Sequence, residues 1–331
     1  MYLEFRVIPV LLWSFSAVAL GTGLAARSGP VRTGWFVAAL GIGWLLQGVV
    51  AHCVNEVTDW RSGTDRDPAP RVLSGGSKVV RAGLLSEREL VCVGVAAGVA
   101  AVGLGFAVAA ARGWWLLGFG LLGVVGAVAY TLPPVALAYS PFAGEAVAFV
   151  CVVACTLGGY AVQRGSLDGA ALLVGMAHAS YCVSMLMLHH YLDRGPDSRA
   201  EPPKVTSVVR LGARARGYAT AWAFAAFALA CAAVGVVGWQ VAPMAVAALV
   251  GVFLQVRVRP DDPGSVTRAE AWVIGLGIVA ALTSAVLLAP QLGWVLLVPV
   301  VLVPLELVVG RGWLAPALAA SGDPPGRPPL P

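Results

Sequence analysis

Charge is scarce in this sequence, since only 12% of its 331 residues are Asp, Glu, Lys or Arg. Soluble domains carry about 25% charged residues, so the composition excludes a disordered chain and a typical soluble enzyme. The six cysteines lie in or beside apolar stretches without C-x-x-C spacing, which argues against a disulfide framework or a thiolate metal site. These absences indicate an integral membrane protein, in which each ionisable side chain is costly and therefore a candidate functional residue.

Long apolar stretches are abundant, and about 20 such residues cross the hydrocarbon core of a bilayer as a helix. The stretches do not alternate as β-barrel strands do, and the 40 glycines suit close helix packing in lipid. The sequence therefore predicts an all-α integral membrane protein. Ten candidate spans are found, at residues 7–26, 34–54, 90–111, 114–132, 142–163, 168–189, 218–239, 241–257, 270–289 and 292–310.

The distribution of Lys and Arg predicts the orientation of these spans. With the N-terminus in the cytoplasm, 18 of the 22 basic residues fall on the inner side and four on the outer side. This asymmetry fits the positive-inside rule and explains the net charge of +5 without a nucleic-acid partner. We expect a multi-pass protein of the inner or plasma membrane, surrounded by membrane lipids, with its N-terminus and longest loops in the cytoplasm.

The first long polar loop, at residues 55–89, opens with an acidic cluster. If the preceding helix continues, Asn55, Glu56 and Asp59 share one helical face. Carboxylate and amide oxygens in such a cluster suit Mg²⁺, which prefers carboxylates together with phosphate oxygens and water. The alternative is a solvated acidic loop in which Asn55 caps the helix.

The second long polar loop, at residues 193–216, lies on the same predicted face and opens with Asp193 and Asp197. Gly195 and Pro196 come between these two acids, so we expect the helix to end near Asp193. The alternative is a turn with Asx-type hydrogen bonds. Both loops continue with basic residues, among them Arg71, Lys78 and Lys204. Two acidic clusters with nearby cations would suit metal ions and a diphosphate, although most of these bases also serve as cytoplasmic topology anchors.

An ordered series of short motifs resembles the UbiA superfamily of intramembrane prenyltransferases. The first loop reads N-E-x-x-D-x-x-x-G-x-D from Asn55 to Asp65, and the dihydroxynaphthoate (MenA-like) branch of that superfamily has N-D-x-x-D-x-x-x-G-x-D. The other similar stretches are Ser74–Ser77, Gly83–Ser86, Tyr130–Pro134, Gly144-Glu145, Gly158–Gln163, Asp193-x-x-x-Asp197, Lys204-x-Thr206 and Arg210–Gly212. The resemblance covers roughly residues 6–290.

Four features depart from the superfamily pattern. Glu56 replaces the usual Asp, and His189-His190 stand where relatives often carry Asn-Asn or Asn-Asp. Pro196 interrupts the second motif, and Pro202-Pro203 replace a usual Gly. The superfamily has nine helices, so residues 1–290 would form the prenyltransferase domain, residues 291–311 an additional span and residues 312–331 a disordered tail.

The resemblance implies a nine-helix UbiA-like bundle of two four-helix repeats plus one helix, here with the extra C-terminal span. It implies Mg²⁺-dependent ionisation of an isoprenyl diphosphate and transfer of the prenyl group to a lipophilic, aromatic or quinone-precursor acceptor. The metal ligands would be Asn55, Glu56, Asp59, Asp65, Asp193 and Asp197. The catalytic residues would be Asp59, Asp193, Lys78 and Lys204. Substrate would contact Arg71, Lys78, Lys204, Tyr130, Glu145, Tyr160, His189, His190 and Tyr191.

Two other functions remain open at this level. A terpene cyclase of the same fold would ionise the same donor but quench the cation intramolecularly. A transporter would place ionisable residues near the bilayer midplane, whereas the acids here cluster at one face.

Overall fold

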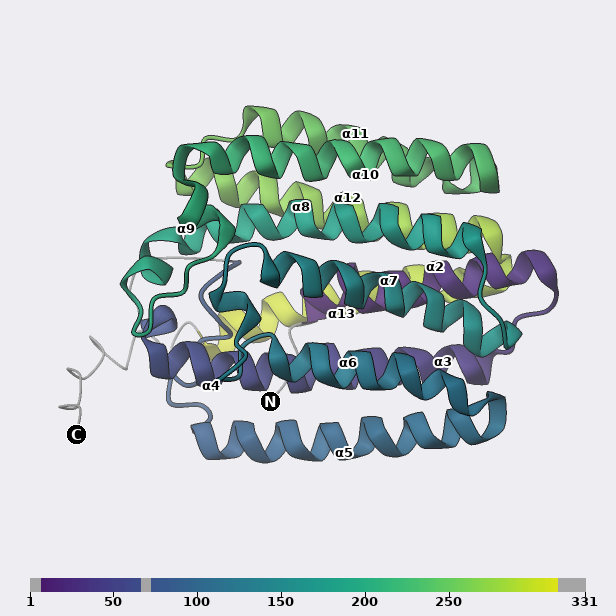
Figure 1. Ribbon diagram of the computed structural model, residues 1–331, viewed down its shortest axis with the longest axis horizontal. Coiled ribbons are helices and arrows are strands. Elements are labelled where there is room, and N and C mark those ends of the chain that lie inside the picture. Colours follow the sequence, from purple (N-terminus) through teal and green to yellow (C-terminus); the bar gives the residue numbers. More distant parts are fainter. Residues whose placement is uncertain (1–6, 67–72, 315–331) are drawn as a thin grey trace.

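Helices make up nearly all of the computed structural model, which describes residues 7–66 and 73–314 (Figure 1). Within these ranges nine helices are long and apolar enough to cross a membrane, and no β-strand occurs. The predicted all-α membrane architecture is therefore confirmed. The main elements are α1 (Val7–Val10), η2 (Leu11–Phe15), α2 (Ser16–Ala25), α3 (Thr33–Gly43), η4 (Trp44–Ala51), α4 (His52–Ser62), α5 (Glu87–Arg112), α6 (Leu117–Ala129), α7 (Ala143–Arg164), α8 (Gly169–Arg199), α9 (Ser207–Leu211), α10 (Ala215–Val237), α11 (Ala242–Arg257), α12 (Pro263–Leu288), η10 (Pro290–Leu296), α13 (Leu297–Val309) and η11 (Gly310–Leu314).

The helices lie side by side in one bundle. Helices α8, α10, α11 and α12 occupy one side of it, α3, α5 and α6 the other, and α2 and α7 lie between them (Figure 1). The spans Val7–Ser28 and Gly169–Arg199 are the two most buried of the nine, so they form the centre. The α4–α5 and α8–α10 connections meet at one end of the bundle (Figure 1), as expected for two loops on one membrane face.

Small residues bring the central helices into backbone contact. A Cβ atom at Gly159 would lie 2.6 Å from the carbonyl oxygen of Val18, and one at Gly21 would overlap the carbonyl of Thr156. Helices α2 and α7 can therefore pack this closely only because these positions are glycine, which is the packing expected in lipid.

Three helix boundaries differ from the sequence prediction. Helix α8 does not end near Asp193 but continues through Pro196 to Arg199. Proline removes one backbone hydrogen bond and disfavours a helix interior, but Pro196 is buried and lies in the final turn. Helix α12 begins at Pro263, seven residues before the predicted start, because Asp262 caps it by accepting a hydrogen bond from the Ser265 N–H at 3.1 Å.

The third difference concerns the expected span at 114–132, which is a shorter apolar helix over Trp114–Ala129. The residues that follow include Pro133 and Pro134, which cannot continue a helix. The turn they form leads to η7 (Leu137–Tyr139) and brings this segment to the end of the bundle that carries the two loops.

An additional apolar helix follows the ninth predicted core helix, over Pro290–Gly312. Its α13 segment packs against α1, and Glu306 accepts a hydrogen bond from the backbone N–H of Ile8 at 3.1 Å. Residues 310–314 are still helical. The rest of the predicted disordered tail lies outside the described residues.

Candidate active site

The second membrane helix carries the first acidic cluster beyond the apolar region. Helix α4 continues to Ser62, as the shared face of Asn55, Glu56 and Asp59 requires, and ends where Gly63 adopts a left-handed conformation. The chain then turns through η5 (Thr64–Arg66), which carries Asp65. Glu56, Asp59 and Asp65 are all buried, so this cluster is not a solvated loop.

The continuation of α8 places Asp193 and Asp197 one turn apart on the same helical face. Both are buried. The following loop folds back on this turn, because the Lys204 N–H donates to the carbonyl of Asp197 at 2.9 Å. Lys204 also forms an ion pair with Asp59, so the two acidic clusters form one site.

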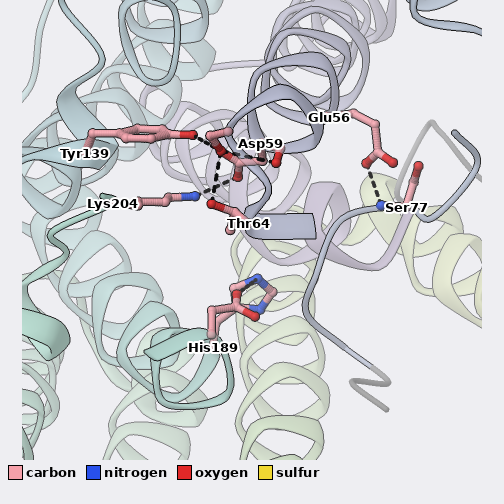
Figure 2. Close-up of polar contacts among 9 residues, drawn as sticks. Glu56, Asp59, Thr64, Ser77, Tyr139, His189 and Lys204 are labelled. Carbon is pink, nitrogen blue, oxygen red and sulfur yellow. Dashed lines mark hydrogen bonds and ion pairs between the residues drawn. The ribbon is translucent and has the colours of Figure 1, made fainter. Parts of the chain in front are cut away.

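Lys204 joins the clusters directly. Its Nζ lies 2.6 Å from Oδ2 of Asp59, and both side chains are buried (Figure 2). Burial by itself would lower the pKa of the Lys204 ammonium, but the carboxylates of Asp59 and Asp197 outweigh it and raise that pKa well above its usual value. Lys204 is therefore a permanently charged cation inside the site.

Tyr139 is a site residue that the sequence analysis missed. Its hydroxyl donates to Oδ1 of Asp59 at 2.7 Å and lies 2.8 Å from the Ser62 Oγ (Figure 2). It binds the carboxylate oxygen of Asp59 that Lys204 does not contact. A signal was present, since Tyr139 lies between the Tyr130–Pro134 and Gly144-Glu145 motifs.

The loop after α4 closes over the first cluster. The Ser77 N–H donates to Oε2 of Glu56 at 2.6 Å (Figure 2). Gly76, with φ +69°, lies so close that a Cβ there would be 2.7 Å from the same Glu56 oxygen and would overlap Asp65 Oδ2. Lys78 lines the cavity described below and donates to the Ser74 carbonyl at 3.2 Å. Arg71, expected to contact substrate, lies outside the described residues.

The acidic residues fit a hard cation. Oδ2 of Asp65 and both carboxylate oxygens of Asp197 are buried and have no hydrogen-bond partner among the described residues. Burial, together with the carboxylates of Asp59 and Glu56, raises the pKa of Asp65 well above its usual value. Within residues 7–66 and 73–314 no three His, Cys, Asp or Glu side chains could hold a metal ion by themselves. The unpartnered carboxylate oxygens of Asp65 and Asp197 are the type of ligand that Mg²⁺ takes. Mg²⁺ needs only one or two carboxylates, because phosphate oxygens and water complete its shell.

A second polar group adjoins the acids on α8. His189 lies with Nδ1 2.9 Å from Glu270 Oε1 and Nε2 3.6 Å from Asp193 Oδ2. His190 lies with Nδ1 4.0 Å from Glu145 Oε1, and Glu145 also accepts a hydrogen bond from Ser207. The sequence analysis missed Glu270, because the predicted span began at that residue.

A large apolar cavity begins at this polar site. Its volume is about 1120 Å³, and its polar end is lined by Asn55, Asp59, Asp65, Asp193 and Lys204, with His189 and His190 beside them. Along α7 its lining runs from Val147 to Val162, or about 22 Å at 1.5 Å per residue. The cavity can therefore hold a long apolar chain with one end at the acids.

The other predicted substrate contacts divide between the cavity and the surrounding core. Tyr130 lines the cavity, and burial raises the pKa of its phenol to about 12, which keeps the hydroxyl neutral. Tyr160, Tyr191 and Glu145 do not line the cavity. Tyr160 and Tyr191 pack into apolar clusters, and Glu145 lies behind His190. Their predicted contacts with substrate stay a prediction.

Comparison with known families identifies the fold. A model of the UbiA prenyltransferase family matches residues 14–276 of the chain. The chain belongs to this family. The predicted UbiA resemblance is thereby confirmed, including the all-helical fold.

Individual UbiA relatives agree with this assignment. The chain is 34% identical over 139 residues to 1,4-dihydroxy-2-naphthoate octaprenyltransferase of Bacillus subtilis (strain 168). That match covers 42% of this chain and 43% of the relative, which is less than half of each.

Two solved structures share the fold. A UbiA homologue from Archaeoglobus fulgidus bound to DMAPP and Mg²⁺ superposes with a TM-score of 0.59 at 16% identity, covering 84% of this chain and 98% of that one. An apo UbiA homologue from Aeropyrum pernix K1 gives a TM-score of 0.61 at 16% identity, covering 82% and 96%.

Proposed function

We propose that this chain is a Mg²⁺-dependent membrane prenyltransferase that transfers the prenyl group of an isoprenyl diphosphate to an aromatic or quinone-precursor acceptor. The observation that carries the proposal is the apolar cavity of about 1120 Å³ that ends at buried carboxylates and the Lys204 ammonium. The Archaeoglobus fulgidus homologue, bound to DMAPP and Mg²⁺, supports the donor and metal. The naphthoate octaprenyltransferase supports the acceptor class.

The residues that would hold Mg²⁺ are those of the two acidic clusters. Asp59, Asp65 and Asp193 line the cavity. Asp197 does not line it, but both of its carboxylate oxygens lack a hydrogen-bond partner among the described residues and could face a metal ion. When bound, the metal would neutralise charge that develops on the departing diphosphate. Glu56 supports this set from behind, since it holds the Ser77 N–H and does not line the cavity.

The chain's own residues carry the rest of the mechanism. The cavity binds the apolar tail and excludes water, which would otherwise capture the allylic cation. Lys204 and Lys78 line its polar end and provide positive charge for the diphosphate oxygens. Tyr139 and Lys204 each hold one carboxylate oxygen of Asp59, so this carboxylate needs little reorganisation during the reaction.

Purified protein incubated with an isoprenyl diphosphate and Mg²⁺ tests this function. With 1,4-dihydroxy-2-naphthoate present, mass spectrometry should find a prenylated product and diphosphate release should rise. Asp59→Ala and Asp193→Ala should abolish both. A cyclic hydrocarbon formed without acceptor would instead establish a terpene cyclase. Unchanged diphosphate release by the two variants would refute the site, and absence of release with donors of every length would refute the function.

We further propose that the polar end of the bundle faces the cytoplasm, which the asymmetry of basic residues supports. The exposed positions Ala213 and Leu167 lie in connections at opposite ends of the bundle. In a variant with Cys92 and Cys231 changed to serine, a membrane-impermeant maleimide should label Leu167→Cys in intact cells. It should label Ala213→Cys only after permeabilisation, and the reverse pattern would refute the orientation.

A further inference from the structure

Glu270 is a buried acid on the wall of the cavity, and the proposed mechanism does not use it. It lies on α12 with 1% of its surface exposed. One carboxylate oxygen, Oε1, lies 2.9 Å from Nδ1 of His189. The other, Oε2, is buried and has no hydrogen-bond partner among the described residues. One carboxylate oxygen of Glu270 is therefore bonded within the protein, and the other is left without a partner in the wall of the cavity.

The position of this pair within the cavity limits what the ligand can be. Glu270 and His189 both line the cavity, together with the apolar side chains of Met185, Leu186 and Ile274. His189 also lies 3.6 Å from Asp193 (Figure 2 shows His189 below the Asp59–Lys204 pair). The pair thus lies where the acidic site meets the apolar cavity, next to the point at which the prenyl group would leave the diphosphate.

The Oε2 atom of Glu270 requires a hydrogen-bond donor as its partner. A carboxylate repels a diphosphate, and an apolar chain cannot satisfy it. A buried acceptor without a partner is costly, whereas a bond from a hydroxyl to an ionised group is stronger than one between neutral groups. A flat hydroxylated ring would donate a hydrogen bond from its O–H to the carboxylate. Its faces would pack against the neighbouring aliphatic side chains.

We propose that Glu270 and His189 form the acceptor subsite, in which Glu270 accepts a hydrogen bond from a ring hydroxyl of the acceptor. His189 is a positioning residue, because its imidazole holds the Glu270 carboxylate in place. This inference rests on the proposed prenyltransferase function and adds to it the residue that recognises the acceptor. No residue of the acidic clusters has this role.

Glu270→Gln tests the subsite with almost no change in side-chain size. The amide can still accept from His189, but it presents N–H groups where the hydroxyl should bind. We expect the KM for 1,4-dihydroxy-2-naphthoate to rise by about tenfold or more, since one charge-assisted hydrogen bond is lost. The KM for the donor and the Mg²⁺ concentration for half-maximal activity should stay within about twofold of the wild type.

Tyr181→Phe is the matched control. The Tyr181 hydroxyl donates to the Val273 carbonyl at 2.7 Å, so it also links α8 to α12 but does not line this cavity. If the kinetic effect came from weaker α8–α12 packing, Tyr181→Phe would raise the acceptor KM as well. We expect it to leave that KM unchanged. If Glu270→Gln fails to fold, Glu270→Met replaces it, because Met needs no hydrogen bond in a buried position and should give the same acceptor-specific loss.

An inhibitor series adds a measurement that a purely structural role would not change. Glu270→Gln should weaken inhibition by a hydroxylated naphthalene about as much as it raises the acceptor KM. It should leave inhibition by the corresponding methyl ether unchanged. A rise in donor KM or in Mg²⁺ requirement equal to the rise in acceptor KM would overturn the subsite in favour of a donor or metal role. An unchanged acceptor KM would overturn it as well. Failure of the proposed function would be distinguishable, because the wild-type protein itself would then form no prenylated product.

Discussion

The Nζ of Lys204 lies 2.6 Å from Oδ2 of Asp59, although 145 residues separate them in the chain. Asp59 comes from the helix before the first polar loop and Lys204 from the loop after α8, so this ion pair joins the two halves of the site. Both members are buried, which makes the pair costly to break. The contact therefore ties the assembly of the active site to the docking of two distant loops.

Lys204→Met should abolish diphosphate release and destabilise the protein by ~3–5 kcal/mol, because Asp59 would remain as a buried unpaired carboxylate. The double variant Asp59→Asn/Lys204→Met should recover much of the stability without recovering activity. Thermal unfolding in detergent and diphosphate release measure the two effects. Arg214→Ala, which removes an exposed cation of the same loop, should change neither, and equal effects of both substitutions would contradict a specific role for Lys204.

Asp65→Asn should separate stability from activity. The substitution removes a buried carboxyl group whose ionisation is opposed by burial and by the carboxylates of Asp59 and Glu56, so in EDTA the variant should melt above the wild type. Mg²⁺ should raise the melting temperature of the wild type more than that of the variant, because a cation stabilises the state it binds. Transfer activity should fall by at least about 100-fold. Asp261→Asn removes an exposed carboxylate and should leave all three measurements unchanged, and a Mg²⁺ response equal to that of the wild type in Asp65→Asn would argue against metal binding there.

Gly76→Ala should inactivate the protein. The new Cβ would lie 2.7 Å from Glu56 Oε2 and overlap Asp65, so the loop would have to move away from the acids. Gly165→Ala is the matched control, because Gly165 also has a positive φ of +73° but has no atom within 4 Å of its Cβ position. It should lose only the ~1 kcal/mol that a left-handed alanine costs and keep its activity. Loss of activity in both variants would show that backbone strain alone is responsible.

Gly158→Leu should shorten the donor that the protein accepts. Gly158 lines the cavity, and the nearest atom to its Cβ position is Phe119 Cγ at 3.9 Å, so a larger side chain fits but occupies space within the cavity. The kcat/KM for a long isoprenyl diphosphate, divided by that for a short one, should fall in Gly158→Leu. The control is Gly235→Leu, assayed with the same donors. Gly235 on α10 has open space around it, so that control should keep the wild-type ratio. An unchanged ratio in Gly158→Leu would show that the prenyl chain does not extend along α7.

The sequence predicted the architecture well because lipid imposes simple rules on composition and length. Apolar stretches identified the spans, whereas the sequence left open whether the helix before Asn55, Glu56 and Asp59 continues past the apolar region, as α4 does. Prediction was weaker where tertiary contacts override local preference. Pro196 favoured a helix end, but its helix continues and aligns Asp193 with Asp197.

The missed residues have the same explanation. Glu270 was placed at the start of a span because the seven preceding residues are less apolar, yet they are helical and put it inside the bundle. Tyr139 contacts Asp59 across 80 residues of sequence, and no local pattern encodes that distance. Tyr160 and Tyr191, predicted to contact substrate, pack into apolar clusters beside the cavity, a placement that depends on helix rotation and that the sequence does not specify.

The hydrogen bond from Ile8 to Glu306 has a consequence for biosynthesis. Glu306 and Ile8 both line the cavity, and 298 residues separate them. At 5–20 residues per second, translation of that interval takes about 15–60 s. During this time α13, which carries Glu306, has not yet been made. The part of the cavity wall that Ile8 and Glu306 form together is therefore the last part to be completed during synthesis.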